Sequence, residues 1–207
     1  MMKENAYGHR IAAAILIGGR SSRMGYPKED IVISRDGRTF LDRICDEVDK
    51  CYGECLQGRY LSVRKGQKKS RDGYSAAEDK YDDIGPLGGL ISVLMKARED
   101  GYDAVLLLAC DMIYYGSSEI KIICQNYEGQ DIIFARTEGR YIQPLASIYS
   151  VNILPVAEDL VKKGNYRLRD LAEGTDSVGY FDSECSEAYI NVNTVSDQSL
   201  YCDSLQK

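Results

Sequence analysis

An apolar run at residues 11–17 ends at a glycine pair and leads directly into a loop, 18–28, that is rich in glycine and basic residues. Continuous apolar runs of this length are typical of strands buried on both faces of a sheet. The run is too short to span a bilayer and marginal for the core of a signal peptide. We therefore expect a buried strand in a cytoplasmic protein with no membrane partner.

The rest of the chain alternates short apolar runs with segments of helical periodicity. Thr39 and Asp42 have the spacing of a capping box, and apolar residues at helical spacing follow them. The strongest strand pattern covers 104–109 and ends just before Asp111, and Ser117 is predicted to cap a further helix. Other strands are predicted at residues 60–63, 131–135, 142–149, 178–181 and 190–192, and other helices at 87–98, 151–163 and 168–173. Such alternation predicts an α/β fold, a single three-layer sandwich around a mostly parallel sheet, over residues 1–207 with a core at about 11–197.

Composition excludes several classes of function. The chain has 26 basic and 32 acidic residues and a net charge of −6, so we expect no nucleic-acid partner. A single histidine, His9, excludes histidine-rich zinc sites and leaves any Ser-His-Asp triad dependent on that residue. The seven cysteines form no C-x-x-C pair and are odd in number, which favours a reducing cytoplasm.

Ligands of open α/β sheets bind outside the carboxyl ends of the strands, so the residues after each strand are the candidates for function. The glycines of loop 18–28 allow backbone amides to face an anion, and Arg23 and Lys28 add positive charge, which suits a polyphosphate. The alternative is a flexible basic loop. Asp111, after the strongest strand, could hold Mg²⁺ against substrate phosphates, or could only form a turn. The glycines of 85–89, before a helix, favour either anion binding or close helix packing.

Together these features resemble a known family. Residues 16–28 read Leu-Ile-Gly-Gly-Arg-Ser-Ser-Arg-Met-Gly-Tyr-Pro-Lys, which is similar to the L-A-G-G-x-S-x-R-M-G-x-x-K signature of molybdenum cofactor guanylyltransferases and related nucleotidyltransferases. Further matches follow in order at 85–89, 110–112, 143–145 and 191–194. The resemblance implies a fold of the nucleotide-diphospho-sugar transferase type. It also implies transfer of GMP from GTP to the terminal phosphate of molybdopterin, with Mg²⁺ as cofactor, pyrophosphate as product and a molybdoenzyme as candidate client.

The resemblance also assigns roles to residues. Arg23, Lys28 and Asp111 would be catalytic, and Asp111 would bind the metal. Glu78 is an alternative to Asp79, because the match is offset by one residue. The implied nucleotide-binding residues are Leu16, Ile17, Gly18, Gly19, Lys28, Ser62, Asp79, Asp111 and Asn193.

Departures from the family pattern leave other functions open. Glu29 and Asp30 replace apolar residues, and two acids beside a phosphate loop weaken anion binding unless they point away. The alternatives are a cytidylyltransferase or another small-molecule-phosphate nucleotidyltransferase of the same fold, and a non-catalytic maturation factor for the molybdenum cofactor. A cysteine-dependent redox or metal protein is a further class. Buried structural thiols are the better interpretation of Cys45, Cys110 and Cys124.

Overall fold

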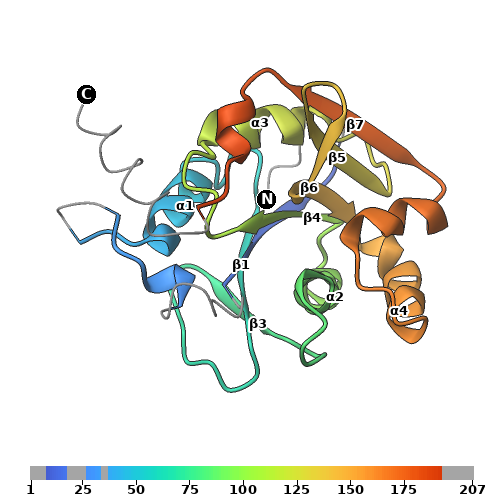
Figure 1. Cartoon of the computed structure of the whole chain (residues 1–207), viewed down its shortest axis with the longest axis horizontal. Helices are drawn as coiled ribbons and strands as arrows, with labels where there is room; N and C mark the ends of the chain where they lie inside the picture. The colour runs from blue at the N-terminus through green and yellow to red at the C-terminus, as the bar shows by residue number, and fades with distance from the viewer. Residues whose placement is uncertain (1–7, 18–26, 34–36, 193–207) are drawn as a thin grey trace.

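A seven-stranded sheet forms the centre of the molecule in the computed structural model, which describes residues 8–17, 27–33 and 37–192 (Figure 1). Its strand order is β3-β2-β1-β4-β6-β5-β7. Strand β6 runs antiparallel to both its neighbours, and all the other adjacent pairs are parallel, as predicted. The strands are β1 (Ile11–Leu16), β2 (Gly58–Val63), β3 (Ser75–Glu78), β4 (Ala104–Ala109), β5 (Ile132–Thr137), β6 (Tyr141–Ser150) and β7 (Val178–Ser183).

Helices cover both faces of this sheet. On one face, β1 packs through Ile11, Ala13 and Ile15 against the layer that contains α1 and α3. On the other, its alternate residues Ala12 and Ala14 face α2 and α4. The α-helices are α1 (Phe40–Asp49), α2 (Pro86–Glu99), α3 (Ser117–Asn126) and α4 (Leu154–Lys162), and the 3₁₀ segments are η1 (Lys28–Asp30), η2 (Val151–Ile153), η3 (Leu168–Gly174) and η4 (Ser186–Tyr189). The three-layer α/β sandwich is confirmed.

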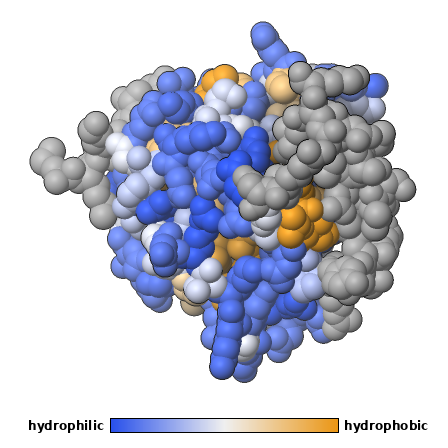
Figure 2. All heavy atoms as spheres, turned by 90° about the vertical axis from the view of Figure 1, so that its left-hand side faces the viewer, coloured by the Kyte–Doolittle hydropathy of each residue, from blue (hydrophilic) through white to orange (hydrophobic). Residues whose placement is uncertain are grey.

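The outer surface is mostly polar, as expected when the apolar side chains are buried in the two core layers. Figure 2 shows a face that is mostly hydrophilic, with small apolar areas between polar ones. The large apolar side chains that are exposed, such as Tyr52 and Tyr180, come from separate parts of the chain. No helix in the described part of the chain is long and apolar enough to cross a membrane.

The register of the central strands brings their carboxyl ends to one edge. Leu16 of β1 pairs with Ser62 of β2 on one side and with Ala109 of β4 on the other. Strand β3 ends opposite Val63, so the residue that follows it lies at the same edge. The sheet therefore collects the segments that follow four strands into one region.

Several local predictions were right and others were wrong. The capping box exists: the Asp42 N–H donates to Thr39 Oγ1 at 3.2 Å, and the Thr39 N–H donates to the Asp42 carboxylate at 3.0 Å. Ser117 is not the N-cap of α3; Gly116 is, and the Ser117 N–H donates to the Glu47 carboxylate of α1 at 2.8 Å.

The C-terminal predictions were only partly right. Residues 151–163 begin with a 3₁₀ turn before α4, and 168–173 form a 3₁₀ helix rather than an α-helix. The strand predicted at 190–192 was wrong. There Ile190 is half exposed, and Val192 packs in a small cluster with Ile33 and Phe40, so these apolar residues serve side-chain packing rather than a ladder.

Candidate active site

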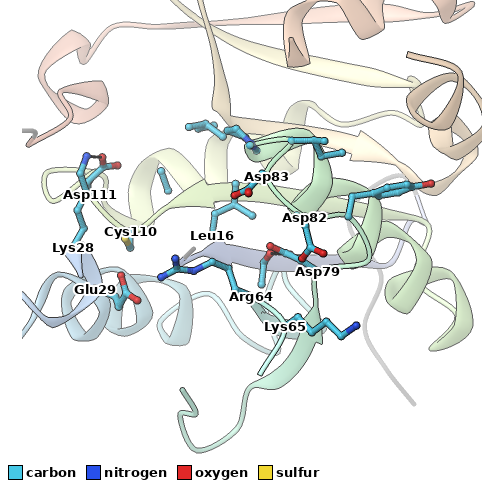
Figure 3. A pocket seen from close by; sticks show the side chains of 18 residues that line it. Leu16, Lys28, Glu29, Arg64, Lys65, Asp79, Asp82, Asp83, Cys110 and Asp111 are labelled. Carbon is cyan, nitrogen blue, oxygen red and sulfur yellow. Dashed lines mark hydrogen bonds and ion pairs between the residues drawn. The ribbon is translucent and has the colours of Figure 1, made fainter. Parts of the chain in front are cut away.

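A cavity of about 630 Å³ opens at the carboxyl ends of β1, β2 and β4. One side of it carries Lys28 and Asp111, the other carries Asp79, and Leu16 lies between them (Figure 3). These four residues come from four different segments of the chain and were all named from the sequence. Ser62 also lines the cavity.

An ion pair forms one side of the cavity. Lys28 Nζ donates to Asp111 Oδ2 at 2.7 Å, and the two side chains are 23% and 13% exposed. Lys28 is the first residue of η1, and Asp111 lies two residues after the end of β4. No described residue donates a hydrogen bond to the second carboxylate oxygen, Oδ1, so this atom can accept another ligand.

The arrangement fits a magnesium ion that has only one or two ligands from the protein. Mg²⁺ is commonly held by one or two carboxylates together with substrate phosphates and water, rather than by a complete protein cage. Within residues 8–17, 27–33 and 37–192, no three His, Cys, Asp or Glu side chains are placed to hold a metal ion. Asp111 Oδ1 therefore suits an ion that takes its other ligands from phosphate oxygens and water.

A second hydrogen-bonded pair forms the opposite side. Ser62 Oγ donates to Asp79 Oδ1 at 2.9 Å, and Ser62 is buried. Burial raises the pKa of Asp79, while the hydrogen bond from Ser62 and the positive charge of Arg64 oppose this rise. The neighbouring Glu78 is exposed and accepts from the Gly66 N–H at 2.8 Å, outside the cavity lining. The structure therefore brings Asp79, not Glu78, into the cavity.

Helix α2 approaches this pair at Gly89. A Cβ atom on Gly89 would lie 2.7 Å from both Leu16 Cδ2 and Ser62 Oγ. The absence of a side chain at Gly89 therefore allows α2 to pack closely against β1 and β2. This is one of the two roles considered for the glycines of 85–89. Gly85, the N-cap, has a φ of 67° and lines the cavity, so the start of the helix borders the site.

The two unusual acids of η1 are both paired. Glu29 is 2% exposed and accepts a hydrogen bond from Gln67 Nε2 at 2.8 Å. Burial raises the pKa of Glu29. The more exposed Asp30 forms an ion pair with Lys69. Both acids thus contact the basic loop, residues 64–72.

The side chain of Ile17 does not line the cavity. Ile17 is fully buried in the core layer that contains α1 and α3, and its N–H donates to the Ser62 carbonyl at 3.3 Å. The predictions for Gly18, Gly19, Arg23 and Asn193 lie outside the described residues.

Sequence reasoning gave no role to Arg64 and Lys65, which line the cavity with Asp82 and Tyr81. For Arg64 a signal existed. It stands two residues after Ser62, and side chains two apart along a strand point to the same face.

The three cysteines predicted to be buried structural thiols are buried. They are Cys45, Cys110 and Cys124, and none of the six described cysteines forms a disulfide. Burial raises the pKa of the Cys45 thiol to about 12, which makes it a poor nucleophile at neutral pH.

The family model of the MobA-like NTP transferase domain matches residues 13–178, which include the whole cavity lining. This chain belongs to that family. A MobA-like relative from Methanosarcina mazei, named probable molybdenum cofactor guanylyltransferase, is 26% identical over 204 residues, covering 90% of this chain and 87% of the relative.

Two solved structures share the fold of this MobA-like chain. One is the molybdopterin-guanine dinucleotide biosynthesis protein A of Archaeoglobus fulgidus, with a TM-score of 0.76, 16% identity and coverage of 94% of this chain and 98% of that one. The other is 4-diphosphocytidyl-2C-methyl-D-erythritolsynthase of Anaerococcus prevotii, with a TM-score of 0.72, 15% identity and coverage of 96% and 97%. The fold is thus of the nucleotide-diphospho-sugar transferase type.

Proposed function

We propose that this MobA-like chain transfers GMP from GTP to the terminal phosphate of molybdopterin and releases pyrophosphate. The observation that carries the proposal is the pairing in one cavity of Lys28 with Asp111 and of Ser62 with Asp79. One pair suits phosphates and a metal ion, and the other suits the edge of a base. The name of the Methanosarcina relative supports the choice of guanine and of the molybdenum cofactor.

The Ser62–Asp79 side would bind the base. Ser62 donates one hydrogen bond to Asp79 Oδ1, so both carboxylate oxygens keep acceptor sites for a ligand. Guanine presents two adjacent donors, N1–H and the 2-amino group, to a carboxylate, whereas cytosine presents one amino group at the corresponding edge. Leu16, which lines the cavity between its two sides, would supply apolar surface for the ring.

The Lys28–Asp111 side would bind the phosphates. Bound there by Asp111 Oδ1 and phosphate oxygens, Mg²⁺ would neutralise charge on the triphosphate. The hydrogen bond to Asp111 orients the Lys28 side chain, whose ammonium group would contact the phosphates. Arg23 would supply a second positive charge there. An oxygen of the molybdopterin phosphate forms a bond to the α-phosphorus of GTP, and the bond to the bridging oxygen breaks, with its electron pair leaving on pyrophosphate. Such transfer depends on positioning and charge stabilisation, so no histidine or covalent intermediate is required.

The test is incubation of the protein with Mg²⁺, molybdopterin and, separately, GTP, CTP and ATP. Pyrophosphate release and the mass of the dinucleotide product are measured. We expect product with GTP alone, and its loss when the divalent ion is chelated. Product with CTP alone would identify a cytidylyltransferase. No release from protein that still binds molybdopterin would identify a maturation factor that hands the cofactor to a molybdoenzyme.

A further inference from the structure

The basic loop is tied to η1 at two points, beside the cavity. Gln67 Nε2 donates to Glu29 Oε1 at 2.8 Å, and Lys69 pairs with Asp30. The other end of the same Gln67 amide, Oε1, accepts from the Arg64 N–H at 3.0 Å. One buried carboxylate and one amide therefore fix the backbone of Arg64.

The turn between Arg64 and Gln67 is closed by its own backbone as well. The Gln67 N–H donates to the Arg64 carbonyl at 2.9 Å, so both main-chain groups of Arg64 bond to Gln67. A backbone held in this way limits the directions that the Arg64 side chain can take. The direction it takes is into the cavity.

The Arg64 guanidinium has no hydrogen bond or ion pair with any residue of the described ranges, although it lies among acids. In Figure 3 the Arg64 side chain extends from the Asp79 side of the cavity toward Glu29, which lies on the same side as Lys28. Burial raises the pKa of Glu29 and of Asp79, and the positive charge of Arg64 partly opposes both rises, in agreement with a guanidinium that lies between the two carboxylates. Arg64 is solvent-exposed, so a ligand in the cavity can reach it.

We propose that Arg64 binds the triphosphate of the nucleotide and that Gln67, anchored by Glu29, positions it. The proposal rests on the proposed nucleotide binding at this cavity. Lys28 already shares its charge with Asp111, so a triphosphate requires further cations, and the planar guanidinium matches phosphate oxygens with two parallel donors. The proposed role of Arg64 also explains Glu29 and Asp30 of η1. These two acids would hold the phosphate-binding loop in place rather than repel the anion.

The first test measures the dissociation constants of GTP, GMP and guanosine for the wild type and Arg64→Gln, with Mg²⁺ present. We expect Arg64→Gln to weaken GTP binding about tenfold or more, GMP binding less, and guanosine binding hardly at all, because only the phosphates are contacted; tenfold corresponds to about 1.4 kcal/mol. The matched control is Lys68→Gln. Lys68 is an exposed cation of the same loop outside the cavity lining, so its removal should leave all three constants unchanged.

The second test concerns positioning. Gln67→Leu removes the amide that joins Arg64 to Glu29, and we expect a smaller loss of GTP affinity than in Arg64→Gln. In the Arg64→Gln background the same change should cause no further loss, since Gln67 acts through Arg64. Thermal unfolding midpoints of all variants show whether they fold.

The outcomes separate the two proposals. Wild-type protein that binds no nucleotide overturns the proposed function and the role of Arg64 together. Wild-type binding of GTP with no change in Arg64→Gln, or with an equal loss for guanosine, overturns only the phosphate role of Arg64. A loss in Lys68→Gln as large as that in Arg64→Gln would also overturn it, because the effect would then be one of loop charge in general.

Discussion

The 2.7 Å ion pair of Lys28 and Asp111 links η1 to the segment after β4 that carries the proposed metal ligand. Asp111→Asn keeps the shape of the side chain and removes its charge. We expect pyrophosphate release to fall about 10²–10³-fold, the size of effect seen when one charge-stabilising group is removed from an active site. Asp72→Asn, the same change on an exposed loop outside the cavity lining, is the control and should be as active as the wild type. Normal turnover in Asp111→Asn would remove the carboxylate from the mechanism.

Asp79 is the residue on which the choice of base would depend. We expect Asp79→Asn to lower kcat/KM for GTP about 10–100-fold, since a carboxylate that reads two donors is worth about 1–3 kcal/mol of discrimination. The value for ATP should change little, so the preference for GTP narrows. Steady-state kinetics with both nucleotides measure this. Glu78→Gln alters the adjacent carboxylate outside the cavity and serves as the control. An equal fall with every nucleotide would show that Asp79 does not read the base.

At the scale of elements, α1 holds the start of α3 through one carboxylate. Glu47, 7% exposed, accepts from the Ser117 N–H and pairs with Lys50. Burial alone would raise the pKa of Glu47, but the hydrogen bonds from Lys50 and Ser117 bring it below the ordinary value. Because the folded pKa is lowered, ionised Glu47 stabilises the fold above the unfolded pKa of about 4.3. This stabilisation is lost as the pH falls through the folded value.

The prediction concerns Glu47→Gln, which keeps an acceptor and removes the charge. We expect the free energy of unfolding at pH 7 to fall by about 1–2 kcal/mol, as for hydrogen bonds to charged groups. The difference from the wild type should shrink toward zero at a pH below the folded pKa. Urea unfolding at several pH values measures it, and Glu54→Gln, an exposed acid, should show a much smaller difference. A pH-independent difference would mean that shape, not charge, is lost.

How far the sequence predicts each element depends on how its side chains are buried. β1 and β4 were predicted because nearly every residue is buried, and this produces continuous apolar runs. β3 was missed because it lies at the edge of the sheet and buries only Ala77 of its four residues. Contacts between distant segments have no local pattern, so neither the capping of α3 by Glu47 nor the bond from Gln67 to Glu29 could be predicted. Asp111 was found because it follows a predicted strand, whereas Asp79 was named only through the resemblance to the family pattern.

At the scale of the whole molecule, the sheet joins two core layers. Each central strand contributes alternate residues to both layers, as Ile15 and Ala14 of β1 do. The cavity lies at the ends of those same strands, so its shape depends on both layers being packed. We therefore propose that the chain forms a single domain in which loss of either layer destroys the site.

Calorimetry tests whether the chain unfolds as a single domain. We expect one unfolding transition with equal calorimetric and van't Hoff enthalpies, as for a two-state domain. GTP and Mg²⁺ at about 100 times the dissociation constant should stabilise the fold by about 2.7 kcal/mol. For a chain of this size that raises the midpoint by about 5–10 °C, at about 2–4 °C per kcal/mol. Because ligand bound at the strand ends stabilises everything that unfolds with them, the whole transition should move. Two transitions, of which GTP moves only one, would show that the layers unfold separately and that the chain is not a single domain.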